Sequence, residues 1–278
     1  AGQRVGNFIP FTDAYTVEDS ARFDTGDSDY LTRTPGTPTS STVGTFSFWI
    51  KRGIIGAYQT LLQQGWPSNN DAVLCRFNSD DTFLFRMEDT SGNYVIDRGT
   101  KRVFQNTDSW THIHVSWNSA LSTNSACTVT INGAALAATD FNTPINTGGT
   151  SVFPNTSDVL AIGRDEVGTN YYLDGYLSEV VFVDGTQEAV SSFGQTDTST
   201  NRWIPKDPSD ISAFGDEGFY LDMAMENSLG NDVSGNNNDF AMSVGMDNTN
   251  GSNQMYDTPT RNYNVMDGAW ASGDEDAT

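Results

Sequence analysis

Short runs of β-branched and aromatic residues alternate with clusters of Gly, Asn, Asp, Ser and Pro along most of the chain from Ala21 onwards. In residues 111–118 (THIHVSWN), Ile113, Val115 and Trp117 alternate with polar residues. A period of two places these three side chains on one face of a strand, which predicts that this face is buried. The repetition of such segments between turn residues predicts a β-sandwich with very little helix.

Residues 171–185 (YYLDGYLSEVVFVDG) contain a strand that the pattern predicts to be covered on both faces. One face carries three apolar side chains and the other carries two: Leu177, Val181 and Val183, then Val180 and Phe182. Asp174 comes directly before Gly175, and we expect its carboxylate to cap this turn, since Asp favours such positions.

Glu179 lies on the same predicted face as Leu177 and Val181. A buried carboxylate is unfavourable unless a partner compensates its charge. We therefore expect a structural ion pair between Glu179 and either Lys51 or Arg52, in preference to a ligand site.

The chain of 278 residues is strongly acidic, with 14 Lys and Arg against 36 Asp and Glu and a net charge of −22. Such a field repels phosphates, which argues against nucleic acid and anionic membranes as partners. No run approaches the ~20 apolar residues of a membrane span, so we expect no membrane insertion. The cysteines, Cys75 and Cys127, both lie in apolar alternating patterns, and we expect them to be reduced core residues.

Changes in composition divide the chain into an arm, a sandwich and an extension. Residues 1–14 have no clear period and are expected to form an N-terminal arm. The sandwich is expected over residues 15–246, with a long surface connection at 187–213 and a returning strand at 218–223. Residues 247–278 are expected to form a C-terminal extension with an acidic tail.

Five segments resemble, in this order, the strands of a laminin-G-like, concanavalin A-like lectin domain. They are ARFDTGDSDYLTRTPG at 21–36, TFSFWIKRG at 45–53, DSWTHIHVSWN at 108–118, CTVTINGAAL at 127–136 and YLDGYLSEVVFVDG at 172–185. The resemblance implies an all-β, concanavalin A-like jelly-roll sandwich of two antiparallel sheets.

One further segment comes in an unusual order. Residues 218–240 (GFYLDMAMENSLGNDVSGNNNDF) resemble the segment with which ordinary laminin-G-like domains begin, yet here they come last. Either the domain is circularly permuted, or a second domain begins at this point. We prefer permutation, because the roughly 60 residues that follow are few for an independent core.

Other segments are similar to virion proteins of tailed bacteriophages, notably of marine hosts: SSFGQTD at 191–197, WIPK at 203–206, GFYLD at 218–222 and YDTPTRNY at 256–263. This resemblance implies a non-enzymatic protein of a tail fibre, spike, head appendage or capsid decoration. It would lie at the virion surface after assembly in the host cytoplasm. Its expected partners are other virion proteins and a host-surface glycan, and relatives of this kind form homo-oligomers, often trimers.

Two other functions are alternatives: a polysaccharide-degrading enzyme of this fold, and a purely structural decoration or adaptor. The enzyme would need carboxylates at alternate positions of one strand. Asp222 and Glu226 come closest but lack a middle member. His112 and His114 could bind zinc, although packing and hydrogen bonding explain them better. We expect no catalysis.

Calcium is the one cofactor that the sequence makes plausible, because Asp and Asn oxygens in Gly-containing loops are the ligands that it prefers. Two loops supply them: Asp24, Asp27 and Asp29, then Asp232, Asn236, Asn238 and Asp239. The alternative is that these residues stabilise turns without any ion.

Sugar recognition in such folds uses aromatic platforms beside amides and carboxylates. Aromatic residues flanked by turn residues, together with neighbouring amides, are the candidates: Trp66, Asn69, Asn70, Tyr94, Tyr171 and Tyr172. Packing at the rim of the sandwich is the alternative for each of them. For assembly, the candidates are the apolar residues of the arm, Phe8, Ile9 and Phe11, unless they fold back onto the sandwich.

Overall fold

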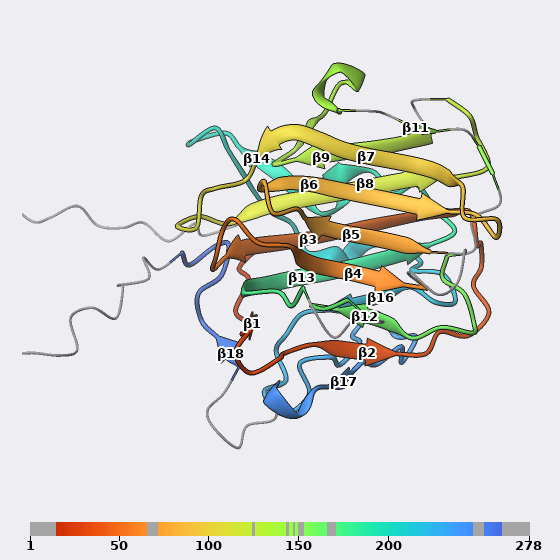
Figure 1. Cartoon of the computed structure of the whole chain (residues 1–278). Helices are drawn as coiled ribbons and strands as arrows, with labels where there is room; N and C mark the ends of the chain where they lie inside the picture. Colours follow the sequence, from red (N-terminus) through yellow and green to blue (C-terminus); the bar gives the residue numbers. More distant parts are fainter. Residues whose placement is uncertain are drawn as a thin grey trace, which may run out of the picture.

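The computed structural model describes residues 15–65, 72–123, 126–142, 145–146, 148–149, 153–165, 171–246 and 253–262. Two antiparallel sheets pack face to face (Figure 1). The predicted all-β, concanavalin A-like jelly-roll sandwich is thereby confirmed. The described helices are short 3-10 turns: η2 (Ala138–Asp140), η3 (Val190–Ser192), η4 (Pro208–Asp210) and η5 (Val244–Met246).

The sheet nearer the viewer in Figure 1, the front sheet, has the strand order β11-β7-β6-β5-β4-β12-β2-β17. Its strands are β2 (Leu31–Arg33), β4 (Gln59–Gln64), β5 (Val73–Phe77), β6 (Thr82–Glu88), β7 (Tyr94–Val103), β11 (Ile145–Asn146), β12 (Leu160–Ile162) and β17 (Ala241–Met242).

The back sheet has the order β10-β9-β8-β3-β13-β1-β18, and β16 also pairs with β13. Its strands are β1 (Ser20–Phe23), β3 (Val43–Arg52), β8 (Thr111–Asn118), β9 (Cys127–Ile131), β10 (Ala134–Ala135), β13 (Gly175–Asp184), β16 (Phe219–Leu221) and β18 (Gln254–Met255). A separate hairpin joins β14 (Gly194–Asp197) to β15 (Arg202–Pro205).

The core lies between the two sheets, as the alternation in β8 predicts. Ile113, Val115 and Trp117 are all fully buried. The indole of Trp117 lies 5.2 Å from the ring of Phe85 in the front sheet and 6.1 Å from that of Phe182 in the back sheet. Aromatic contact across the interface thus joins the two layers, in addition to the burial of apolar area.

A β-bulge in β13 changes the faces that simple alternation predicts. The register with β3 shifts between Ser178 and Val181, and Glu179 adopts a positive φ of 52°. The extra residue brings Leu177 onto the core side, and Val181 faces outwards. The prediction that Leu177 and Val181 share a face is therefore wrong, because a bulge adds one residue to the period of two.

The connection after β13 covers the outer face of the back sheet. Phe193, Ile211 and Phe214 form an apolar cluster with Val181 and Val183 of β13. The connection therefore explains why β13 is buried on both faces, as the sequence predicts.

The late segments of the chain join the same sandwich. β16 pairs antiparallel with β13, placing Leu221 opposite Val180 and Phe219 opposite Phe182. Further on, β18 pairs with β1, so residues after the expected sandwich boundary also add to the back sheet. The ammonium of Lys51 in β3 contacts the Asp257 carboxylate at 2.7 Å and holds this segment in place.

Two smaller sequence features follow expectation. Asn132 and Gly133, which both have positive φ, form the turn between β9 and β10, as an Asn-Gly hairpin requires. Cys75 and Cys127 are free and buried. Within the described residues, no helix has the length and apolar character needed to cross a bilayer.

Candidate functional site

The outer face of the front sheet carries arginines where strands β5 and β6 point away from the core. Arg76 lies between the buried residues Cys75 and Phe77, so alternation directs it outwards. Arg86 occupies the equivalent outward position in β6. In the register of the two strands, Leu74 pairs with Arg86 and Arg76 pairs with Leu84, so the two arginines are diagonal neighbours on one face.

A hollow of about 380 Å³ opens on this face. It is lined mainly by polar and aromatic side chains from strands β5 to β7 and their flanking loops, including Tyr58, Arg76, Asn78, Asp80, Arg86, Asp97 and Asn142. The hollow is open to solvent.

Arg76 is held rigidly beside the hollow. Its guanidinium carbon lies 4.7 Å from the centre of the Tyr58 ring, and its Nε donates a hydrogen bond of 3.0 Å to Oδ1 of Asn78. The Tyr58 ring in turn contacts that of Tyr171 at 5.0 Å. Burial lowers the pKa of Arg76, yet a guanidinium keeps its charge at neutral pH.

Two more arginines of this face stack on tyrosines. Arg86 lies 4.1 Å from the centre of the Tyr94 ring and contacts the Asp97 carboxylate at 2.8 Å. Arg164, which follows β12, lies 3.6 Å from the centre of the Tyr30 ring. We call the three stacked pairs, Arg164 with Tyr30, Arg76 with Tyr58 and Arg86 with Tyr94, the arginine–tyrosine track.

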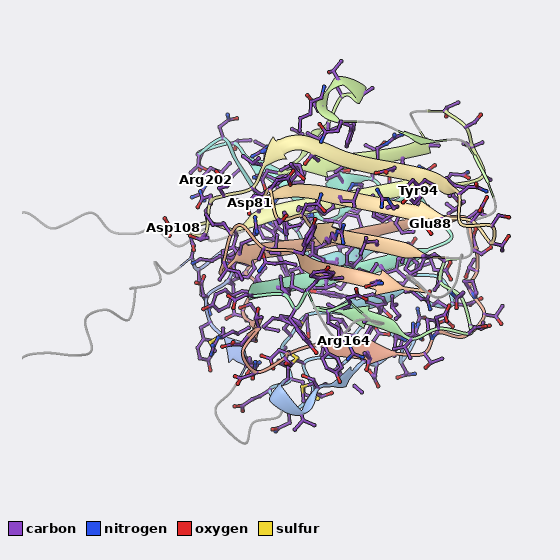
Figure 2. All side chains as sticks on the ribbon, in the orientation of Figure 1. Asp81, Glu88, Tyr94, Asp108, Arg164 and Arg202 are labelled. Carbon is purple, nitrogen blue, oxygen red and sulfur yellow. The ribbon has the colours of Figure 1, made fainter. Side chains whose placement is uncertain are left out.

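Figure 2 labels the two ends of this track on the side that faces the viewer. Arg164 lies over β2 and β12, whereas Tyr94 lies beside the far ends of β6 and β7 together with Glu88. Oε1 of Glu88 is buried without a hydrogen-bond partner among the described residues. Burial raises the pKa of Glu88 to about 7, so this carboxyl group titrates near neutral pH.

The structure brings together part of the predicted sugar site. Tyr94 and Tyr171 both belong to the face described above, and Tyr172 lies beside it with its ring 6.4 Å from that of Tyr30. Trp66, Asn69 and Asn70 lie outside the described residues. The arm residues Phe8, Ile9 and Phe11 lie outside them as well.

The first loop considered for calcium is held largely by its own hydrogen bonds. Oδ2 of the buried Asp29 accepts bonds from the Asp24 backbone N–H at 2.9 Å and from Nδ2 of Asn253 at 2.8 Å. Asp24 also pairs with Arg22, and Asp27 is exposed. Oδ1 of Asp29 has no partner among the described residues, and burial raises the pKa of this carboxyl group.

In the second loop, Asp232 organises the backbone. Its Oδ1 accepts bonds from the backbone N–H groups of Tyr220 and Ser234, both at 2.9 Å. Its Oδ2 accepts from the Ser234 hydroxyl at 2.9 Å and from the Asn238 N–H at 2.8 Å. Both oxygens are therefore engaged by the chain itself, as in a turn stabilised by an Asp side chain.

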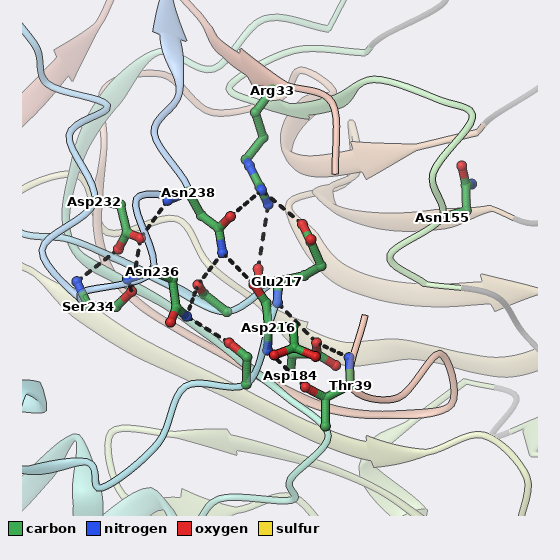
Figure 3. A network of polar contacts seen from close by, with 12 residues as sticks. Arg33, Thr39, Asn155, Asp184, Asp216, Glu217, Asp232, Ser234, Asn236 and Asn238 are labelled. Atoms are coloured by element: carbon green, nitrogen blue, oxygen red, sulfur yellow. Dashed lines mark hydrogen bonds and ion pairs between the residues drawn. The ribbon is translucent and has the colours of Figure 1, made fainter. Parts of the chain in front are cut away.

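The other members of this loop take part in the network of Figure 3. Oδ1 of Asn238 accepts a bond of 2.6 Å from Arg33, which also pairs with Glu217 at 2.8 Å. Asn236 donates to backbone carbonyls, and Asp239 accepts from the Asp232 N–H at 2.8 Å. Among the residues that the structure describes, no three His, Cys, Asp or Glu side chains gather closely enough to hold a metal ion.

The two histidines pack beneath the surface connection. Nδ1 of His112 accepts a bond of 3.0 Å from the Trp203 indole, which leaves its Nε2 to donate to the Ser47 hydroxyl at 2.8 Å. Nε2 of His114 bonds to the Glu188 carbonyl at 3.0 Å. Burial lowers the pKa of both rings, so each is neutral at pH 7 and serves in hydrogen bonding.

The acidic residues considered for catalysis do not alternate along one strand. β16 ends at Leu221, and Met223 has a positive φ of 61°, so the strand does not continue to Glu226. Oδ1 of Asp222 accepts a bond of 3.0 Å from the Ala224 N–H, which closes the turn.

The buried Glu179 is paired with tyrosines, and the predicted ion pair with Lys51 or Arg52 is wrong. Its Oε2 accepts bonds from the hydroxyls of Tyr220 at 2.8 Å and Tyr15 at 3.2 Å. The two cations instead pair with carboxylates elsewhere, Asp257 and Asp81. Burial raises the pKa of Glu179 to about 8, so the carboxyl group is largely protonated at neutral pH.

Asp174 contacts two neighbouring loops. Its carbonyl accepts a bond of 2.8 Å from the Gly53 N–H, and its carboxylate accepts bonds from Thr25. Burial raises the pKa of this carboxyl group. The residue therefore ties the start of β13 to the loops after β1 and β3, and its role in its own turn stays a prediction.

A family model described as the concanavalin A-like lectin/glucanases superfamily matches residues 24–190. No curated protein shows significant similarity to the chain. A solved protein from Bacteroides ovatus, described as a "putative carbohydrate binding protein", aligns with a TM-score of 0.55 and 16% identity, covering 87% of this chain and 60% of that one. At this identity the likeness shows the fold alone.

Two further solved structures align at lower similarity. A heptameric SAP-like pentraxin from Limulus polyphemus aligns with a TM-score of 0.47 and 13% identity over 70% of this chain and 94% of that one. Domains LG4-5 of the mouse laminin alpha1 chain align with a TM-score of 0.43 and 9% identity over 63% of this chain and 43% of that one.

The prediction from the sequence did not include the arginines, although the sequence contains one usable signal. Arg76 and Arg86 each interrupt an apolar strand at a position whose two neighbours are buried. Such a residue must point away from the core, and on a half-exposed sheet it reaches the open face.

Proposed function

The chain belongs to the concanavalin A-like lectin/glucanases superfamily, and we propose that it is a lectin-like protein that binds a glycan on the outer face of its front sheet. The proposal is supported by the single arrangement of Tyr58 and Arg76 in the lining of the hollow, with the ring of Tyr171 packed against that of Tyr58. Sugars present apolar ring faces that stack on aromatic rings, and hydroxyl groups that need fixed donors and acceptors. Both kinds of partner are present here.

The polar groups around the hollow are fixed in place by the fold. Asn78 accepts from Arg76, Asp97 accepts from Arg86, and Asp80 accepts from the Thr82 hydroxyl at 2.6 Å. Groups that are already oriented lose little side-chain entropy when a ligand binds. The face can therefore recognise hydroxyl groups in a defined geometry.

We propose that the protein binds its glycan without cleaving it. Cleavage of a glycosidic bond needs one protonated and one ionised carboxyl group on either side of the bond. In the hollow, Asp97 is engaged by Arg86, and the hydrogen bonds from Thr82 hold the pKa of Asp80 below its usual range. Neither Asp97 nor Asp80 is therefore suited to act as the protonated carboxyl group.

We further propose a place at the surface of a bacteriophage particle, as part of a tail fibre, head appendage or decoration. This proposal is supported by the similarity of residues 191–197, 203–206 and 256–263 to tailed-phage virion proteins. The glycan would then be one on the host surface, and homo-oligomers would present several copies of the face. Immunogold labelling of purified particles with an antibody against the chain tests this location.

The binding proposal is tested with an immobilised glycan array and two variants. The wild-type protein should bind a defined subset of glycans, and Tyr58→Ala should weaken that binding about tenfold. Tyr256→Ala is the matched control, because Tyr256 is 69% exposed and lies outside the hollow. An array without hits for the wild-type protein contradicts the proposal, whereas release of reducing ends from a bound polysaccharide favours the enzyme alternative.

A further inference from the structure

We infer that the glycan is acidic and that Arg76 binds a sugar carboxylate through its two terminal nitrogens. This inference rests on the proposed glycan-binding function and adds the chemical class of the ligand. It is supported by the pairing of cations in the chain, the orientation of the Arg76 guanidinium and the repetition of the stacked pairs across the sheet.

Arginines with no acidic partner are unexpected in a chain with 36 acidic and 14 basic residues. Six of the other eleven Lys and Arg side chains of the described part form ion pairs, such as Lys51 with Asp257 and Arg33 with Glu217. Arg76 and Arg164 form no ion pair with a described residue. Their charges are stacked on tyrosine rings instead, which leaves their electrostatic field directed at the solvent side of the face.

The guanidinium of Arg76 is oriented by two contacts that do not involve its terminal nitrogens. The hydrogen bond from Nε to Asn78 fixes the side of the guanidinium nearest the strand, and the Tyr58 ring fixes the plane of the guanidinium. The two terminal nitrogens have no hydrogen-bond partner among the described residues. A planar pair of donors matches the two oxygens of a carboxylate, and such bidentate bonds are stronger than bonds between neutral groups.

The stacked pairs recur at intervals across the strands. Arg164 follows β12, Arg76 lies in β5 and Arg86 lies in β6, in the strand order β12-β4-β5-β6. Neighbouring strands are about 4.8 Å apart, so the track extends about 14 Å across the sheet. A length of this kind suits an oligosaccharide better than a single sugar.

The acidic groups near the track distinguish the roles of the three arginines. Asp97 neutralises Arg86, so we assign Arg86 to positioning Tyr94 and the wall of the hollow. Asp165 lies near enough to raise the pKa of Arg76 but forms no ion pair with it. The anion site is therefore placed at Arg76, and Arg164 is the second cation along the track.

The test compares acidic glycans with the same glycans after reduction of their carboxyl groups. The probes are polygalacturonate, alginate, hyaluronan and sialyllactose, each beside its carboxyl-reduced form, with binding measured by calorimetry in ~0.15 M salt. At least one acidic probe should bind ten times more tightly than its reduced form. Arg76→Gln should lower affinity for that probe at least tenfold, Arg76→Lys should restore part of it, and neither should change affinity for the reduced form by more than about threefold.

Arg202→Gln is the matched control, because it removes the same charge from an exposed residue of β15, on the hairpin outside the two main sheets. It should leave binding unchanged. If Arg202→Gln lowered the affinity as much as Arg76→Gln, a general charge effect would explain both losses. That result would overturn the assignment of Arg76.

The outcomes separate this inference from the proposed function. Equal binding of acidic and reduced forms, weakened in Tyr58→Ala, overturns the acidic class while glycan binding stands. Preference for acidic probes that survives Arg76→Gln overturns the role of Arg76. Failure to bind any acidic or neutral probe contradicts both proposals.

Discussion

The guanidinium of Arg76 lies over the ring of Tyr58, with 4.7 Å between the guanidinium carbon and the ring centre. The two residues come from adjacent parts of the front sheet, since Arg76 pairs with Thr60, two residues after Tyr58. The ring therefore holds a cation in place and also presents an aromatic surface to the hollow.

This contact predicts how Tyr58 variants bind. Tyr58→Ala should weaken glycan affinity about tenfold, because it removes a stacking surface and releases the Arg76 side chain. Tyr58→Phe should retain most of the affinity, since it keeps the ring. Calorimetry with the best glycan from the array measures both. Equal affinity of the Ala variant and the wild-type protein would contradict the assignment of this face.

The late strand β16 should be essential to the stability of the sandwich. Phe219 is fully buried and its ring lies 5.7 Å from that of Phe182 and 4.8 Å from that of Phe240. Phe219→Ala should lower the free energy of unfolding by about 3–5 kcal/mol in urea denaturation. Val244→Ala, at a residue that is 85% exposed, should change it by less than about 0.5 kcal/mol. A small effect of Phe219→Ala would mean that β16 does not belong to the common core.

Glu179 should make stability fall as pH rises. The folded protein keeps the proton on Glu179 up to about pH 8, whereas the unfolded chain releases it near pH 4.5. Between these values the folded state binds more protons, so raising the pH favours unfolding, by up to about 1.4 kcal/mol per pH unit. Below pH 4.5 both states are protonated and this dependence ends.

Glu179→Gln tests this dependence, since the amide still accepts the tyrosine hydrogen bonds but does not titrate. Urea denaturation at pH 5, 6, 7 and 8 should show the variant gaining stability over the wild-type protein with each step. The difference between the two proteins isolates Glu179 from other groups with raised pKa values, such as Glu88. Parallel pH profiles would refute the raised pKa.

The Lys51–Asp257 pair should hold the segment after β17 much more firmly than a surface pair does. The Lys51 side chain is fully buried, and Asp257 also accepts a bond of 3.0 Å from the Trp110 indole. Asp257→Asn should lower the free energy of unfolding by about 3 kcal/mol, because it leaves a buried ammonium without its anion. Glu18→Gln breaks the exposed pair with Arg261 and should change it by less than about 1 kcal/mol. Equal effects of the two variants, in thermal or urea denaturation, would mean that burial of Lys51 contributes little.

Local alternation was sufficient to predict the sandwich and the buried face of β8, because Ile113 and Trp117 follow an uninterrupted period of two. The same reasoning failed at β13, where the bulge at Glu179 adds a residue that no turn signal announces. Because the face of Glu179 was predicted wrongly, the predicted partners Lys51 and Arg52 were wrong as well. The observed partners, Tyr15 and Tyr220, come from distant parts of the chain.

The candidate site was predicted only in part for a related reason. Tyr94 and Tyr171 could be selected as exposed aromatics beside turn residues. Their relation to Arg76 depends on the register of β5 with its neighbours and on the return of the chain at Tyr171 to the start of β4. Such long-range pairings are set by the whole sandwich, so a single sequence does not reveal which exposed groups share a face.

A crystal structure of the protein with a bound acidic oligosaccharide tests the central claim most directly. The account predicts a sugar ring against Tyr58 and a carboxylate within hydrogen-bond distance of both terminal nitrogens of Arg76. An oligosaccharide bound to the back sheet, or to loops remote from the hollow, with Arg76 and Tyr58 free of contact, would contradict it.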